Sequence, residues 1–123
     1  MYTIEFYENK NGQSELYNQL IELEKESQNS KEARIQFNQI VYCIELLKLQ
    51  GTRLPNKITK HIQNDIWELR PGNNRILYFY YKDSKFVLLH MFRKKTQKTP
   101  KGEIEKAERE IKEYRLMEGD SKR

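Results

Sequence analysis

The sequence is poor in the residues that cross-link a chain or bind metals. Its 123 residues include one cysteine, Cys43, and two histidines, His61 and His90. A single cysteine excludes an intramolecular disulfide framework and is typical of a reducing compartment. Because Cys43 falls among core positions of a predicted helix, we interpret it as a buried structural thiol and not as a nucleophile. The two histidines lack the paired spacing of a zinc site, so we expect neither a metal nor a cofactor.

Long apolar runs and glycine-rich phosphate loops are also missing. No segment reaches the roughly 20 apolar residues of a membrane-spanning helix. The opening MYTIEFYENK lacks the basic and then apolar stretches of a signal peptide. Hydrophobic residues make up 37% and charged residues 33% of the chain, which is polar for a globular protein but too rich in aromatics for disorder. We therefore expect one soluble cytoplasmic domain over residues 1–123, with a frayed tail from about residue 118.

Acidic residues are scarce in one part of the chain. Residues 51–101 contain 12 Lys/Arg and 3 Asp/Glu, a net charge of +9, whereas residues 1–50 carry −3 and residues 102–123 carry −1. Five cations and no acid lie between Arg93 and Lys101. Such a cluster repels itself, so it predicts a basic surface that binds an anion. A merely solvated basic rim is the alternative interpretation.

The hydrophobic periods predict an α+β fold. Residues 2–7 alternate as a half-buried strand, and two amphipathic helices follow, one from Ser14 and one after a capping-box pattern at Asn29 and Glu32. Gly51 is expected to end the second helix. Further strands are expected at 57–62, 65–70, 75–81 and 85–92, the last of them central because it is apolar on both faces. Thr99 and Pro100 are expected as the N-cap and first residue of a final helix.

These elements predict a small twisted antiparallel sheet of about four strands. The helix hairpin would cover one face, and the other face would be partly open beside the C-terminal helix. Arg70 and Arg75 flank the predicted turn PGNN, which brings their side chains together. Two guanidinium groups suit a phosphate diester, because each can bind two of its oxygens. Lys94 and Lys95 leave the central strand nearby.

Other residues could take part in such a site. Glu68 alternates with Arg70 on one strand face, where it could orient the arginine or act as a general base. His90 alternates with Leu88 and Phe92, so it is either a satisfied, partly buried histidine or a titratable group at the rim of the site. Tyr78 and Tyr80 could stack on unpaired bases, or serve as core residues. The expected nucleic-acid-binding residues are Lys57, Lys60, Arg93, Lys98, Lys101, Tyr78 and Tyr80.

Two segments carry a family resemblance. IWELRPGNNRILYFYY and LLHMFRKKTQKTPKGEIEKAEREIKEY resemble the RelE/ParE superfamily of bacterial toxins, in particular the HigB-type, phage-related branch. The resemblance extends over nearly the whole chain and implies the RelE-like fold. It also implies a ribosome-dependent endoribonuclease (an mRNA interferase) whose partners are the ribosome, mRNA and a helix-turn-helix antitoxin of the HigA-like type, with no membrane partner.

The resemblance also assigns roles to particular residues. The arginine that contacts the scissile phosphate falls on Arg75, the arginine before the turn on Arg70, and the basic residue after the last strand on Lys94 or Lys95. RelE-like toxins have lysines on the strand before the turn, where this chain has Ile66 and Glu68, and a tyrosine near the segment that here is TPKG. Glu68 or His90 could take over the missing acid–base role.

The implied chemistry is a metal-free transesterification. The 2′-hydroxyl attacks the adjacent phosphorus, leaving a 2′,3′-cyclic phosphate and a free 5′-hydroxyl. A gyrase-poisoning toxin of the ParE type and a non-catalytic basic nucleic-acid-binding module are the alternatives.

Overall fold

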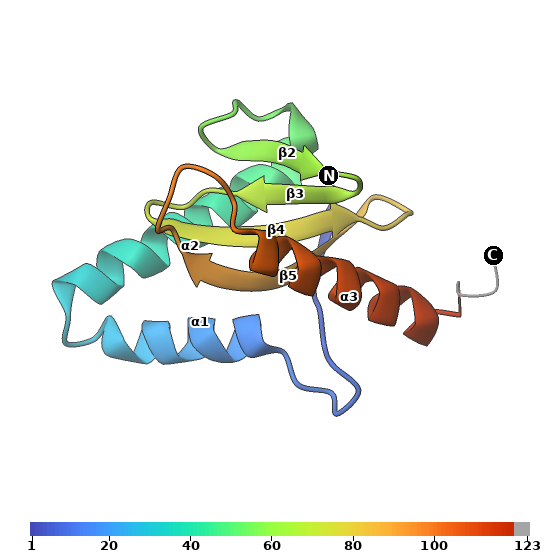
Figure 1. Cartoon of the computed structure of the whole chain (residues 1–123). Helices are drawn as coiled ribbons and strands as arrows, with labels where there is room; N and C mark the ends of the chain where they lie inside the picture. Colours follow the sequence, from blue (N-terminus) through green and yellow to red (C-terminus); the bar gives the residue numbers. More distant parts are fainter. Residues whose placement is uncertain (120–123) are drawn as a thin grey trace.

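The computed structural model describes residues 1–119 and confirms an α+β fold. Residues 120–123, which belong to the predicted frayed tail, lie outside the described residues. In chain order the elements are β1 (Thr3–Phe6), α1 (Glu15–Glu26), α2 (Lys31–Gln50), a 3-10 turn η1 (Gly51–Arg53), β2 (Thr59–Gln63), β3 (Ile66–Leu69), β4 (Asn74–Tyr80), β5 (Lys85–Arg93) and α3 (Lys101–Met117). Figure 1 shows the sheet at the centre of the molecule with α3 crossing it.

The sheet has five strands in the order β1-β5-β4-β3-β2. Strands β2 to β5 form an antiparallel meander, as the sequence predicts. β1, however, pairs in parallel with β5, from Thr3 opposite Lys85 to Phe6 opposite Leu88. The sheet is therefore mixed, and one strand larger than the roughly four expected. Parallel pairing is possible because about 80 residues, including both helices and β2 to β4, connect β1 to β5, whereas a tight turn would impose antiparallel pairing.

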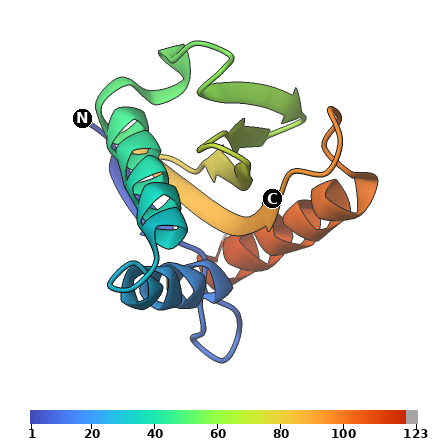
Figure 2. The ribbon, with the colours of Figure 1, turned by 90° about the vertical axis from the view of Figure 1, so that its left-hand side faces the viewer.

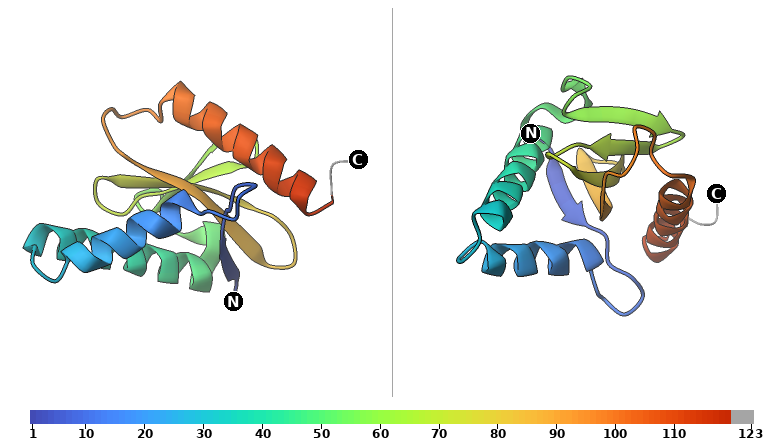
Figure 3. Two further views of the ribbon diagram at one scale, coloured as in Figure 1. Left: turned by 90° about the horizontal axis from the view of Figure 1, so that it is seen from below. Right: turned by 60° about the vertical axis from the view of Figure 1, so that its left-hand side comes forward.

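Helices cover both faces of the sheet (Figures 2 and 3). On one face, α1 and α2 pack through Leu16, Ile40 and Leu47 against inward-facing residues of the sheet such as Leu69 and Ile76. On the other face, α3 builds a second core from Ala107, Ile111 and Tyr114 against Ile66, Leu77 and Phe79. The second face is thus largely covered, where a partly open face was expected. β5 is apolar on both sides because it meets a core on each.

The helix ends follow local chemistry with small shifts from the predicted boundaries. Ser14 caps α1 by accepting from the Tyr17 amide at 3.0 Å. Ser30, and not Asn29, caps α2 by accepting from Ala33 at 3.1 Å. Gly51 ends α2 at φ 62°, a left-handed conformation that glycine adopts without strain. α3 begins at Lys101 with Pro100 as its N-cap and no side-chain capping bond, so Thr99 does not cap it.

A register shift changes which face His90 occupies. Leu77 pairs with His90 while the next residue, Tyr78, pairs with Leu88, so β5 carries one extra residue at this point. Leu88 therefore packs in the α1–α2 core, whereas the ring of His90 faces α3. Simple alternation would place the two on the same face, and the bulge is what separates them.

Candidate functional site

Arg70, Arg75 and Glu68 meet on the α3-side face of the sheet. Glu68 Oε1 accepts a hydrogen bond from Arg70 Nε at 3.0 Å and lies 3.9 Å from Arg75 Nε. The glutamate is only 2% exposed. The turn between β3 and β4 therefore brings the two guanidinium groups together, as predicted, with one buried carboxylate between them. A carboxylate in this position reduces the mutual repulsion of the two cations and fixes their orientation.

Arg75 is held from two sides. Its Nη1 donates to the carbonyls of Gly72 and Asn74, both at 2.8 Å, and its side chain is 12% exposed. Burial lowers the pKa of Arg75, and the neighbouring cation Arg70 lowers this pKa further. The carboxylate of Glu68 opposes both effects. The guanidinium still remains charged. No hydrogen bond involves Nη2 of Arg75 within residues 1–119, so this nitrogen is free to donate to an anion.

The loop of residues 94–100, between β5 and α3, brings the lysines to the same place. The Lys94 amide donates to the carbonyl of Asn73 at 2.8 Å, which ties the start of the loop to the β3–β4 turn. Lys94, Lys95 and Lys98 line a small hollow together with Glu68 and Arg75. The hollow measures about 10 Å³, so an anion would bind across its mouth and not inside it. Arg75 and the loop lysines thus form one cationic surface, which we call the Arg75 site.

Three other predicted lysines lie around this surface. Lys60 pairs with Glu68 across β2 and β3, and paired residues point to the same face of a sheet, so it belongs to the Arg75 side. Lys57 is exposed just before β2. Lys101 is exposed at the first position of α3, beside a groove that it shares with Lys98 and Thr99.

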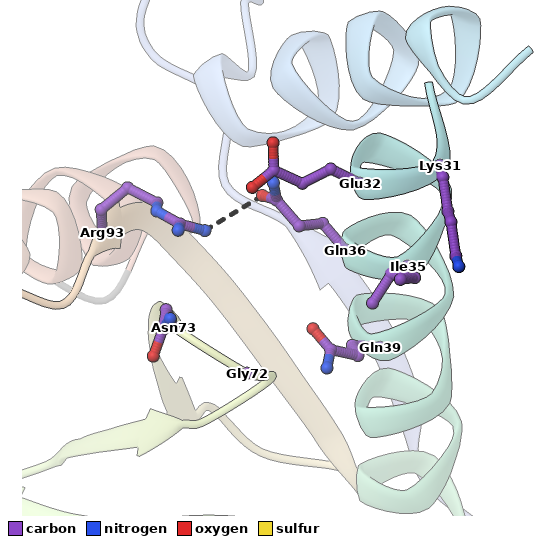
Figure 4. A pocket seen from close by; sticks show the side chains of 8 residues that line it. All are labelled: Lys31, Glu32, Ile35, Gln36, Gln39, Gly72, Asn73 and Arg93. Carbon is purple, nitrogen blue, oxygen red and sulfur yellow. Dashed lines mark hydrogen bonds between the residues drawn. The ribbon is translucent and has the colours of Figure 1, made fainter. Parts of the chain in front are cut away.

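Arg93 lies on the opposite face. It points toward α2, and its Nη1 donates to Gln36 Oε1 at 3.1 Å (Figure 4). With Gln36, Gln39 and the turn residues Gly72 and Asn73, it lines a pocket of about 520 Å³. Although Arg93 and Lys94 are adjacent in sequence, alternation along β5 separates their side chains. The cation cluster of residues 93–101 is therefore divided between the two faces of the sheet.

The two tyrosines are placed differently from the basic residues. Tyr78 is fully buried in the α1–α2 core, and its hydroxyl lies 2.7 Å from Thr59 Oγ1. Its ring is therefore unavailable to a base, and the structure removes it from the expected nucleic-acid-binding set. Tyr80 is 45% exposed but packs edge-on against Phe86, at the far end of β4 from Arg75. Tyr80 lies five residue steps along the strand from Arg75, or roughly 16 Å.

His90 is enclosed beneath α3. It is 1% exposed, with Nδ1 2.6 Å from Glu110 Oε1 and Nε2 2.9 Å from Glu103 Oε1. Both ring nitrogens are therefore engaged by carboxylates of α3. The geometry matches a satisfied histidine that fastens α3 to the sheet. It does not match a group at the rim of the Arg75 site.

Thr99 is the site residue that sequence reasoning missed. Its hydroxyl donates to Glu68 Oε2 at 2.7 Å, on the carboxylate that also contacts Arg70 and Arg75. No local signal could have found it, because a threonine followed by proline is equally typical of an N-cap and the first residue of a helix.

The fold and the Arg75 site define a small basic α+β protein in which Arg75 and the loop lysines share one cationic surface. The family model of the phage-derived Gp49-like proteins (DUF891) matches residues 18–112. The chain belongs to this family, whose members are RelE- and toxin-like proteins of toxin–antitoxin systems. No curated protein matches the chain significantly. None of the helices within residues 1–119 is long and apolar enough to cross a membrane.

Proposed function

We propose that this protein is the toxin of a toxin–antitoxin pair of the HigB type, and that it acts as a ribosome-dependent endoribonuclease on translated mRNA. Membership of the Gp49-like family supports the toxin assignment. The observation that carries the enzymatic part is the Arg75 site, where a fixed arginine with a free Nη2 stands beside two lysines. An inhibitor that acts only by binding needs no such convergence on one phosphate-sized surface.

The proposed reaction is the attack of a ribose 2′-hydroxyl on the adjacent phosphorus. The bond to the 5′-oxygen of the next nucleotide breaks, giving a 2′,3′-cyclic phosphate and a 5′-hydroxyl, and the proton lost by the 2′-hydroxyl balances the one gained by the leaving oxygen. Arg75 and Lys94 or Lys95 would stabilise the charge on the phosphorane, because preorganised donors act most strongly where charge develops. No metal takes part in this scheme.

The same geometry limits the role of the two acid–base candidates. Glu68 is buried and engaged by Arg70, Arg75 and Thr99, so we assign it to orienting the arginines. His90 is closed off by Glu103 and Glu110. The remaining ionisable groups at the mouth of the hollow are cationic, which favours electrostatic catalysis on a substrate that the ribosome holds in position.

A brief induction experiment tests the proposal. We expect growth arrest, with new 5′ ends on translated messages when primer extension is performed, and little cleavage of free RNA by the purified protein. The Arg75→Ala variant, produced at the same level, is the control and should leave messages intact. Growth arrest with intact messages and loss of gyrase activity would instead identify a ParE-type toxin.

The proposed partner is a helix-turn-helix antitoxin of the HigA-like type. Two surfaces are suited to it: the basic Arg75 side, and an apolar groove of about 210 Å³ on the helix hairpin, lined by Phe6, Tyr17 and Phe37 and flanked by Glu24 and Glu45. We favour the Arg75 side, because an acidic strip would neutralise it and block the proposed site at once. In that case complex affinity falls steeply with added salt. An affinity that stays constant with salt would assign the antitoxin to the apolar groove.

A further inference from the structure

The loop that carries the lysines is attached to the sheet at very few points. At its start, the Lys94 amide bonds to the carbonyl of Asn73. Thr96 Oγ1 donates to the carbonyl of Lys98 at 2.7 Å, but this bond lies within the loop itself. In the described part of the chain, Thr99 makes the only side-chain hydrogen bond from the loop to the sheet, to Glu68 Oε2. Residues 94–98 are all exposed, and Thr99 is half-buried.

The two oxygens of Glu68 divide their partners between the two halves of the site. Oε1 faces Arg70 and Arg75, at 3.0 and 3.9 Å, whereas Oε2 accepts from Thr99 at 2.7 Å. The arginines come from the β3–β4 hairpin and the lysines come from the loop. The buried carboxylate of Glu68 therefore connects the loop to the arginines and fixes the position of the loop relative to Arg75.

We propose that Thr99 is a positioning residue, whose hydrogen bond to Glu68 holds Lys94 and Lys95 in register with Arg75. This proposal rests on the proposed function for its effect on rate, but the bond itself can be tested without any cleavage assay. Thr99 does not touch the phosphate, and it acts only through the carboxylate and the loop backbone. Displacement of a catalytic group by about 1 Å can reduce a rate about 100-fold.

The chain offers a closely matched set of variants. Thr99→Val keeps the shape of the side chain but removes the hydroxyl. Thr99→Ser keeps the hydroxyl and removes the methyl group. Thr96→Val removes a loop hydroxyl that has no contact with Glu68, so it controls for the loss of any loop threonine. Thr99→Ala is a second hydroxyl-free variant in case valine disturbs the packing beside Pro100.

The first measurement uses trypsin, because the loop supplies its own cleavage sites at Lys94, Lys95 and Lys98. At a temperature where all variants are folded, we expect Thr99→Val to be cut in the loop faster than the parent protein. Thr99→Ser and Thr96→Val should be cut at about the parental rate. If folded Thr99→Val and Thr99→Ala are both cut at the parental rate, the hydrogen bond between Thr99 and Glu68 does not restrain the loop, and the proposal is overturned.

The second measurement is the single-turnover rate of mRNA cleavage on programmed ribosomes. At saturating toxin, Thr99→Val should be slower by about 10- to 100-fold, with a smaller change in the half-saturating concentration. Thr99→Ser should recover most of the rate. A released loop with parental cleavage would refute the positioning role. If the parent protein cleaves no message, the proposed function fails, and the trypsin comparison alone decides whether Thr99 holds the loop.

Discussion

Replacing Arg75 with alanine gives the sharpest test of the site, because its effects on stability and on rate differ in size. Truncating the side chain of a residue just after a turn ordinarily changes the free energy of unfolding by no more than about 0.5 kcal/mol. Here, however, the side chain is 12% exposed and donates to the carbonyls of Gly72 and Asn74. Losing these charge-assisted bonds would lower the free energy of unfolding by about 3 kcal/mol. Arg70 remains beside Glu68, so the buried carboxylate keeps one cationic partner.

That loss is too small to account for inactivation through unfolding. If the parent protein has a stability of about 5 kcal/mol, at the low end for a domain, about 2 kcal/mol remains and more than roughly nine in ten molecules stay folded. Removing one donor that stabilises a developing charge typically slows a reaction about 100- to 1,000-fold. We therefore expect Arg75→Ala to melt some degrees lower, remain folded at 25 °C by circular dichroism, and lose nearly all cleavage.

The assay is single-turnover cleavage on programmed ribosomes, with the folded fraction measured in the same buffer. Arg75→Lys should recover only part of the rate, because an ammonium group cannot make the two-pronged contact of a guanidinium. A folded Arg75→Ala protein that cleaves mRNA at the parental rate would refute both the assignment of Arg75 and the mechanism built on it.

Three further predictions concern other parts of the molecule. Lys94→Ala and Lys95→Ala should differ in the cleavage assay, because only one of the two lysines faces the phosphate. Loss of that lysine should lower the maximal rate, whereas loss of its neighbour should mainly lower the affinity for ribosomes. If the two substitutions change the rate and the affinity equally, the assignment is contradicted. His90→Ala should lower the free energy of unfolding by about 3 kcal/mol in urea titrations, since it removes a buried ring and its hydrogen bonds to Glu103 and Glu110, while cleavage per folded molecule is retained. Burial and a hydrogen bond to Glu5 raise the pKa of Tyr114 to about 12, so the folded state keeps a proton that the unfolded state releases above about pH 10, and stability should fall from there as the pH rises. Melting temperatures that do not change between about pH 9 and 11, or the same change in Tyr114→Phe, would contradict the assignment to Tyr114.

Much of the fold follows from local patterns in the sequence. The alternation in IWELR places Trp67 and Leu69 in one core and Ile66 in the other, as the structure confirms. Arg70 and Arg75 come together because a four-residue turn joins their strands. These features depend on residues that are close in the chain, and such features are what periodicity and turn chemistry can specify.

The features that sequence reasoning missed depend on distant residues or on irregular backbone. The parallel pairing of β1 with β5 joins residues about 80 positions apart, and nothing in the alternation of residues 2–7 indicates its direction. The bulge opposite Leu77 and Tyr78 turns His90 away from the face of Leu88. Thr99 is a residue type that commonly caps helices, but its hydroxyl instead donates a hydrogen bond to the buried carboxylate of Glu68, 31 residues earlier. Each case is decided by tertiary packing, which a local pattern does not contain.

The position of β5 between β1 and β4 has a consequence for how the protein folds during synthesis. Within residues 1–119, β1 has one neighbour in the sheet, β5, which follows it by about 80 residues in the chain. Until that strand is available, β1 has no hydrogen-bonding partner in the sheet, and neither core is complete because both draw residues from β5. Closing so long a loop makes folding slow and dependent on contacts that are distant in sequence. A growing chain therefore has no native intermediate that already holds the lysine loop beside Arg75, and the Arg75 site can form only after residues 94–99 have been translated.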